Sequence, residues 1–191
     1  MSRSERWKRW VWSISAIAAF IGLLFFVPRR THLAATPPAA SLIEETFWKL
    51  ESGAPIAPEA MRQALSEATQ VSDSQPRLYA QAVALLLLYG DTLTRITAPM
   101  VYIQRLLQMR EDPTIEAYLG RLNLHIGRPE RAYAYLRGAL ARDPRCGTAY
   151  LFLARMLPDS ACFWLNQGAS AIYSPAEAEA RQTFISSLRC S

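Results

Sequence analysis

The spacing of apolar residues predicts a chain built almost entirely from helices. The pattern is clearest between Pro113 and Pro144, where apolar residues recur at steps of three and four, which places them on one face of a helix. Gly127 and Pro129 interrupt this stretch, and such a pair is typical of one helix ending and the next beginning. Asp143 then ends the second helix, because a residue before proline is disfavoured in helical geometry. The stretch therefore predicts a helical hairpin.

The same signals predict further helices on both sides of this hairpin. Prolines 113, 144 and 175 lie 31 residues apart, and a period of this length favours an array of helical hairpins over one irregular bundle. We expect an all-α domain of three to four hairpins with a last, capping helix. The other predicted helices cover residues 41–52, 58–71, 75–89, 98–111, 147–157, 161–173 and 175–188.

The central hairpin resembles the tetratricopeptide repeat, a family with a characteristic order of small and large apolar residues and a closing proline. Glu116 and Asn123 depart from the family pattern, because they stand where large aromatic side chains are usual. An ordinary helical hairpin of an unrelated all-α domain is the alternative. The residues that match are Leu119, Gly120, Ala132, Leu136, Ala139 and Pro144.

The resemblance implies a superhelix that binds peptides or helices on a concave face lined by the first helix of each hairpin. Carried over to the central hairpin, it selects four partner-binding residues. Arg121 is suited to a carboxylate, and His125 adds a pH-sensitive contact. The alternative for these two is a plain surface arginine and a packed histidine. The predicted partner-binding residues are Ala117, Arg121, Leu124 and His125.

The N-terminal part of the chain predicts a membrane anchor. Residues 10–27 contain no charged side chain, and a helix of this length spans about 27 Å, close to the apolar thickness of a bilayer. We therefore expect a basic tail at 1–9, a transmembrane helix at 10–28, a proline- and alanine-rich linker at 29–40 and the helical domain at 41–191. A signal peptide cleaved after the apolar stretch is the alternative.

The orientation follows from the positive residues that flank the apolar stretch. Arg3, Arg6, Lys8 and Arg9 precede it, whereas only two arginines, at 29 and 30, follow directly. The side richer in positive residues stays in the cytoplasm. We therefore expect a single-pass protein of the cell (inner) membrane, with its N-terminus in the cytoplasm and its helical domain in the periplasm.

The positive charge of the chain belongs to this anchor. The formal net charge is +5, and residues 1–30 supply all of it, with six Lys or Arg against Glu5. Residues 31–191 are therefore balanced, which argues against binding of nucleic acid. Within them, acids prevail over 41–75 and arginines over 105–155. An ordinary solvated surface explains this, and an arginine-lined surface that docks an acidic partner is the alternative.

Catalytic and metal-binding patterns do not emerge from the sequence. The chain has two histidines, His32 and His125, which are too far apart for a ligand pair, and it has no phosphate-binding loop. We expect no enzyme activity, no cofactor and no metal. Cys162 and Cys190 would meet if the last two helices pack antiparallel, which predicts a disulfide; three buried thiols, with Cys146, are the alternative.

These observations predict a non-enzymatic scaffold or accessory subunit of a membrane protein complex, in contact with the bilayer through residues 10–28 and with partner proteins through its helices. Such a subunit is expected to expose apolar residues on several faces, and the aromatic pairs Phe47–Trp48 and Phe163–Trp164 favour it. The alternative is a transient periplasmic chaperone or assembly factor for secreted or maturing envelope proteins, which predicts an open, polar groove.

Overall fold

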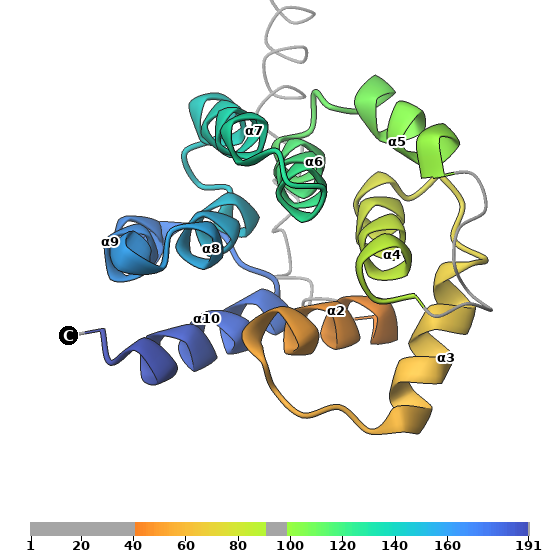
Figure 1. Ribbon diagram of the computed structural model, residues 1–191, viewed down its shortest axis with the longest axis horizontal. Helices are drawn as coiled ribbons and strands as arrows, with labels where there is room; N and C mark the ends of the chain where they lie inside the picture. The colour runs from red at the N-terminus through yellow and green to blue at the C-terminus, as the bar shows by residue number, and fades with distance from the viewer. Residues whose placement is uncertain (1–40, 91–98, 191) are drawn as a thin grey trace, which may run out of the picture. The chain divides into compact units, whose positions relative to one another are not determined.

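The computed structural model of the chain describes residues 41–90 and 99–190, and most of these residues lie in helices (Figure 1). The predicted transmembrane helix at 10–28, its tail and its linker lie outside the described residues. Within the described ranges, no helix is both long and apolar enough to cross a membrane. The α-helices are α2 (Leu42–Ser52), α3 (Pro58–Ala68), α4 (Pro76–Tyr89), α5 (Pro99–Gln108), α6 (Pro113–His125), α7 (Pro129–Arg142), α8 (Gly147–Met156), α9 (Ala161–Gln167) and α10 (Pro175–Leu188).

Three helical hairpins, α4/α5, α6/α7 and α8/α9, follow one another along the chain, and α4, α6 and α8 pack side by side. Local signals set the ends of these helices. The Asp112 side chain accepts a hydrogen bond from the backbone N–H of Thr114 and so caps α6. Gly127 takes a left-handed conformation, with φ of 73°, which lets the chain turn into α7. The all-α prediction is confirmed for the described residues.

Gly120 allows the two helices of the central hairpin to approach closely. A β-carbon at this position would lie 2.9 Å from the side chain of Leu136 and 3.1 Å from the carbonyl oxygen of Ala132. Ala132 and Leu136 are themselves buried. A larger side chain at position 120 would therefore force α6 and α7 apart.

Polar contacts stabilise the two residues that depart from the repeat pattern. Glu116 is largely buried and forms an ion pair with Arg142 of α7, with 3.0 Å between the carboxylate oxygen and Nε. Gly138 makes room for it, because a β-carbon there would lie 2.6 Å from a Glu116 oxygen. Asn123 donates a hydrogen bond from its side chain to the carbonyl of Leu119. At Glu116 a polar contact with α7 thus stands where the repeat pattern has an aromatic side chain, whereas the contact of Asn123 stays within α6.

The helix predicted at 161–173 is shorter than expected. It ends at Gln167 and continues as a short 3-10 turn, Gly168–Ser170. The next residues instead pair with the start of α8: the N–H of Ile172 donates to the carbonyl of Arg145 at 2.8 Å, and the N–H of Gly147 donates to the carbonyl of Ile172 at 3.2 Å. These backbone bonds cannot form if the helix continues.

The first two helices do not stack as a further repeat. α2 packs against α3, α4 and the last helix, α10, and Figure 1 shows it between α4 and α10. A stacked repeat would contact only its neighbour. Side chains of α2 also contact α6 and α8. We call α4, α6 and α8 the inner helices, because they face α2, and α5, α7 and α9 the outer helices.

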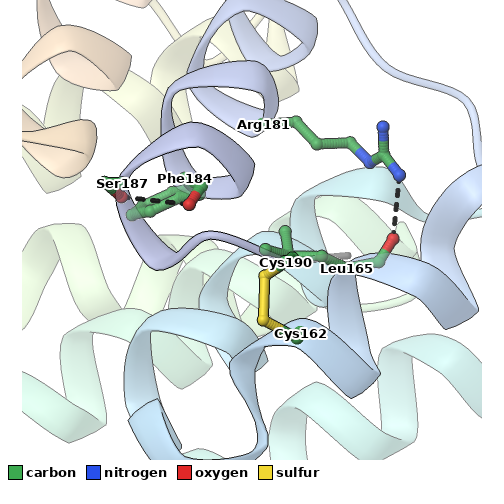
Figure 2. The surroundings of a disulfide bond; sticks show 6 residues. All are labelled: Cys162, Leu165, Arg181, Phe184, Ser187 and Cys190. Carbon is green, nitrogen blue, oxygen red and sulfur yellow. Dashed lines mark hydrogen bonds between the residues drawn. A yellow bond between two sulfur atoms is a disulfide. The ribbon is translucent and has the colours of Figure 1, made fainter.

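A disulfide attaches the end of the chain to the last hairpin. Cys162 of α9 is joined to Cys190, which follows α10, with the two Cα atoms 5.3 Å apart (Figure 2). Nearby, an Nη of Arg181 on α10 donates to the carbonyl oxygen of Leu165 on α9 at 2.9 Å. The third cysteine, Cys146, is buried and free. The disulfide therefore holds α10 in place, and α10 in turn packs on α2.

We expect the double substitution Cys162→Ser with Cys190→Ser to lower the free energy of unfolding by about 3 kcal/mol. The two residues are 28 positions apart, and closing a loop of this length restricts the unfolded chain by about that amount. Urea titration of the full chain in detergent, followed by circular dichroism, measures it. A reducing agent should lower the free energy of unfolding of the native protein to that of the variant, and it should leave the value of the variant unchanged. A difference below about 1 kcal/mol would contradict the prediction.

Candidate functional site

The inner helices and α2 share one aromatic cluster. Phe47 and Trp48 of α2 are almost completely buried. The ring of Phe47 lies 5.4 Å from that of Tyr118 on α6, and Trp48 stacks on Phe152 of α8 at 5.2 Å. Such pairs stabilise beyond the area they bury. The inner face, meaning the side of the inner helices toward α2, is therefore part of the hydrophobic core.

A buried ion cluster lies next to these rings. Glu51, on α2, has no exposed surface and receives donors from all three inner helices. Nε of Arg121 lies 3.0 Å from both carboxylate oxygens, and Nε of Arg155 lies 2.9 Å from one of them. The hydroxyl of Tyr89 donates to the same carboxylate at 2.6 Å. Arg155 also donates to the backbone carbonyl of Glu51.

The electrostatics of the cluster keep it charged. Burial alone would lower the pKa of Arg121, but its hydrogen bonds to the Glu51 carboxylate and the charge of that group raise the pKa above its ordinary value. Burial, together with the nearby carboxylate, raises the pKa of Tyr89 to about 12. Tyr89 therefore stays a neutral donor at physiological pH. The cluster consists of one anion, two cations and one neutral hydroxyl, with short contacts between them.

The structure separates the four predicted partner-binding residues. Ala117 is fully buried, and Arg121 is 8% exposed and held by Glu51. The prediction is wrong for these two as accessible groove residues, because both are buried and Arg121 is paired with α2 of the same chain. Leu124 is half-buried and His125 is exposed at the end of α6. A role of Leu124 and His125 in partner binding stays a prediction.

The decisive residue that sequence reasoning missed is Glu51. Its signal is visible in hindsight: residues 43, 47 and 51 are four apart and therefore lie on one face of α2, and Ile43 and Phe47 are apolar. An acid in line with a buried apolar stripe indicates a buried partner of opposite charge. The aromatic pair Phe47 and Trp48, which was expected to contribute to an exposed surface, is buried against the inner helices instead.

The described residues offer little for catalysis. Across 41–90 and 99–190, no three His, Cys, Asp or Glu side chains form a group that could hold a metal ion. Burial raises the pKa of the Cys146 thiol to about 12, so it is not a reactive thiolate at neutral pH. The arrangement instead positions charged and aromatic groups for packing.

The geometry thus defines a helical-hairpin repeat domain whose inner face is occupied by its own first helix. Residues 113–156, which comprise α6, α7 and α8, match the family model described as tetratricopeptide repeat. This part of the chain is therefore a tetratricopeptide repeat, and the resemblance is confirmed for it. Comparison with curated proteins and with solved structures gives no significant match. Tetratricopeptide repeats indicate a protein–protein interaction scaffold, a class that is typically non-enzymatic.

We expect Glu51→Gln to lower the free energy of unfolding by about 3 to 5 kcal/mol, because it leaves the buried Arg121 guanidinium without its anion. The matched control is Glu45→Gln on the same helix. Glu45 pairs with Lys49, and both side chains are about a third or more exposed, so its loss costs less than about 1 kcal/mol. Urea titration of both variants tests the difference. An equal loss of free energy of unfolding in both variants would show that the Glu51 cluster stabilises the fold no more than an exposed ion pair does.

A second buried carboxylate gives a pH-dependent stability. Glu177 of α10 accepts hydrogen bonds from the Thr148 hydroxyl and from the backbone N–H of Ser174. Burial raises the pKa of Glu177 to about 7, although both hydrogen bonds lower it; Glu44 raises it further and Arg77 lowers it. The folded protein therefore holds a proton that the unfolded chain releases at lower pH, and stability falls as the pH rises toward 7.

We expect this fall to be about 2 to 3 kcal/mol between pH 5 and pH 8, and to be absent from Glu177→Gln. The glutamine keeps an oxygen for the Ser174 N–H and carries no charge to bury. The measurement is the free energy of unfolding of both proteins across this pH range. Other titrating groups contribute equally to both, so the difference isolates Glu177. If the free energies of unfolding of the two proteins changed with pH in the same way, the assignment of this pH dependence to Glu177 would be wrong.

Proposed function

We propose that this protein is a membrane-anchored scaffold, a stable accessory subunit of a membrane protein complex. Residues 10–28 would anchor it in the inner membrane, with the N-terminus in the cytoplasm and the repeat domain in the periplasm. The proposal joins the tetratricopeptide repeat at 113–156 with the uncharged apolar stretch near the N-terminus.

The occupied inner face favours a stable subunit over a transient chaperone. A transient chaperone was expected to have an open, polar groove, but α2 fills this face with Phe47, Trp48 and Glu51. Opening it would expose large aromatic side chains and a buried charge, which is energetically costly. Large apolar side chains are instead exposed on other elements, as expected for a surface that partner chains cover: Met100, Val101, Ile126, Phe163, Ile172 and Leu188.

The Cys162–Cys190 disulfide supports the location of the domain. Disulfides persist in oxidising compartments such as the periplasm and are rare in the cytoplasm. This one joins the chain end to α9 and leaves Cys146 as a buried thiol. A domain that folds outside the cytoplasm is consistent with the flanking charges of the apolar stretch.

The test is purification of the tagged full chain from native membranes in mild detergent, with mass spectrometry of what stays bound. We expect a fixed ratio to a few integral membrane proteins, retained at high salt because large apolar contacts are little screened. After denaturation of the same membranes, which exposes the buried Cys146, thiol-specific alkylation should label one cysteine before reduction and three after it, because two of the three form the disulfide.

The control replaces residues 1–28 with a cleavable signal peptide. When it is produced in excess over its partners, this variant should appear in the soluble periplasmic fraction, because the domain keeps its fold but loses its anchor. A broad, salt-sensitive set of bound proteins would contradict a stable subunit and favour a chaperone. Alkylation of all three cysteines before reduction would contradict the proposed compartment.

A further inference from the structure

Aromatic side chains and an arginine gather where the outer helices α7 and α9 meet. The guanidinium carbon of Arg137 lies 5.8 Å from the centre of the Trp164 ring, and the Phe163 and Trp164 rings meet edge to face at 5.1 Å. Tyr133 is one turn before Arg137 on α7 and therefore lies on the same side of the helix. We call Tyr133, Arg137, Phe163 and Trp164 the α7/α9 patch.

The patch combines a buried tryptophan with more exposed aromatic side chains. Trp164 is 8% exposed, whereas Phe163 is 54% and Tyr133 38% exposed. The Arg137 guanidinium lies over the Trp164 ring in a cation–π contact, which occupies none of its five N–H donors. Arg137 makes no ion pair with any residue of 41–90 or 99–190. Tyrosine, tryptophan and arginine are the residues that contribute most to binding energy at protein interfaces.

The charges around the patch indicate an acidic partner. α9 carries no charged side chain, and Glu130 is the only acid of α7. Two further exposed cations, Arg128 and Arg131, lie at the start of α7 and pair with no other described residue. Asp159, shortly before α9, is a second exposed acid, so the three arginines 128, 131 and 137 outnumber the two acids. A guanidinium of this kind binds a carboxylate through two parallel hydrogen bonds.

We propose that the α7/α9 patch binds a protein segment in which an acidic side chain stands next to an apolar one. The carboxylate pairs with Arg137, and the apolar side chain packs on the exposed ring of Phe163. This inference rests on the proposed scaffold function and names the surface and the kind of partner. It also agrees with the geometry of the inner face, which α2 keeps closed.

An anionic membrane surface is a different class of partner with some of the same chemistry. Insertion into lipid headgroups requires several apolar side chains in one row. On α9, Phe163 is the sole exposed large apolar residue. The observations therefore favour a protein segment, and the membrane becomes an outcome of the test.

The first experiment measures binding to the full chain, immobilised in nonionic detergent. The probes are a pool of capped 12-residue peptides randomised over Glu, Asp, Leu, Phe, Pro and Gly, and a matched pool with Gln and Asn in place of the acids. We expect the acidic pool to be retained about tenfold more. Arg137→Gln and Phe163→Ser should each remove most of this excess, whereas Arg62→Gln, an exposed arginine on α3, should not.

Equal retention of the two pools would overturn the proposal, as would an acidic preference that both patch variants keep. Vesicles of phosphatidylglycerol and phosphatidylcholine provide the lipid arm. Vesicle binding that Arg137→Gln and Phe163→Ser abolish, without any acidic peptide preference, would assign the patch to the membrane and also overturn the proposal. Thermal melts of each variant verify that the fold is unchanged.

The second experiment separates this inference from the proposed function. The complex is isolated from native membranes that contain either the native chain or Arg137→Gln with Phe163→Ser. We expect the patch variant to lose at least one partner of the fixed-ratio complex. A complex that stays intact with the variant would refute the patch and leave the scaffold function standing. The absence of any fixed-ratio complex with the native chain would refute the function itself.

Discussion

The structure depends on the burial of one carboxylate, that of Glu51. A charge with no exposed surface is tolerated only where donors surround it, and the donors converge at one place, where Tyr89, Arg121 and Arg155 meet. Apolar packing is non-directional, so the rings of α2 alone would allow the helix to shift along the inner face. The ion cluster does not allow this shift, because it fixes both the position and the rotation of α2.

This placement changes the mechanics of a repeat array. In an ordinary array each unit contacts only its neighbours, so its parts open independently. Here α2 contacts α4 and α10 directly, and its aromatic side chains reach α6 and α8. The first and last helices of the domain are therefore packed together, and the disulfide ties the last helix to α9. Contacts that join both ends of the domain favour cooperative unfolding.

Sequence reasoning succeeded where the determinants are local. The end of α6 follows from Gly127 and that of α7 from Asp143, and the close approach of the pair follows from Gly120. Sequence reasoning failed where the interacting residues are far apart in the sequence. Glu51 and Arg121 are 70 positions apart, and helical periodicity shows which side of a helix is apolar but not which element covers it. Arg121 therefore looked like a groove residue, although it is a buried partner of α2.

A closed inner face separates stability from binding. Phe47, Trp48 and Glu51, through which α2 is held on the inner face, are buried, so a partner that used this face would have to replace part of the hydrophobic core. The exposed side chains of the outer helices are not part of this core: Phe163 is largely exposed, and an exposed aromatic ring contributes little to folding. The proposed partner segment can therefore contact this ring and the nearby guanidinium of Arg137 without disturbing the core. The inner face thus determines whether the domain folds, and the outer helices remain free to determine what it binds.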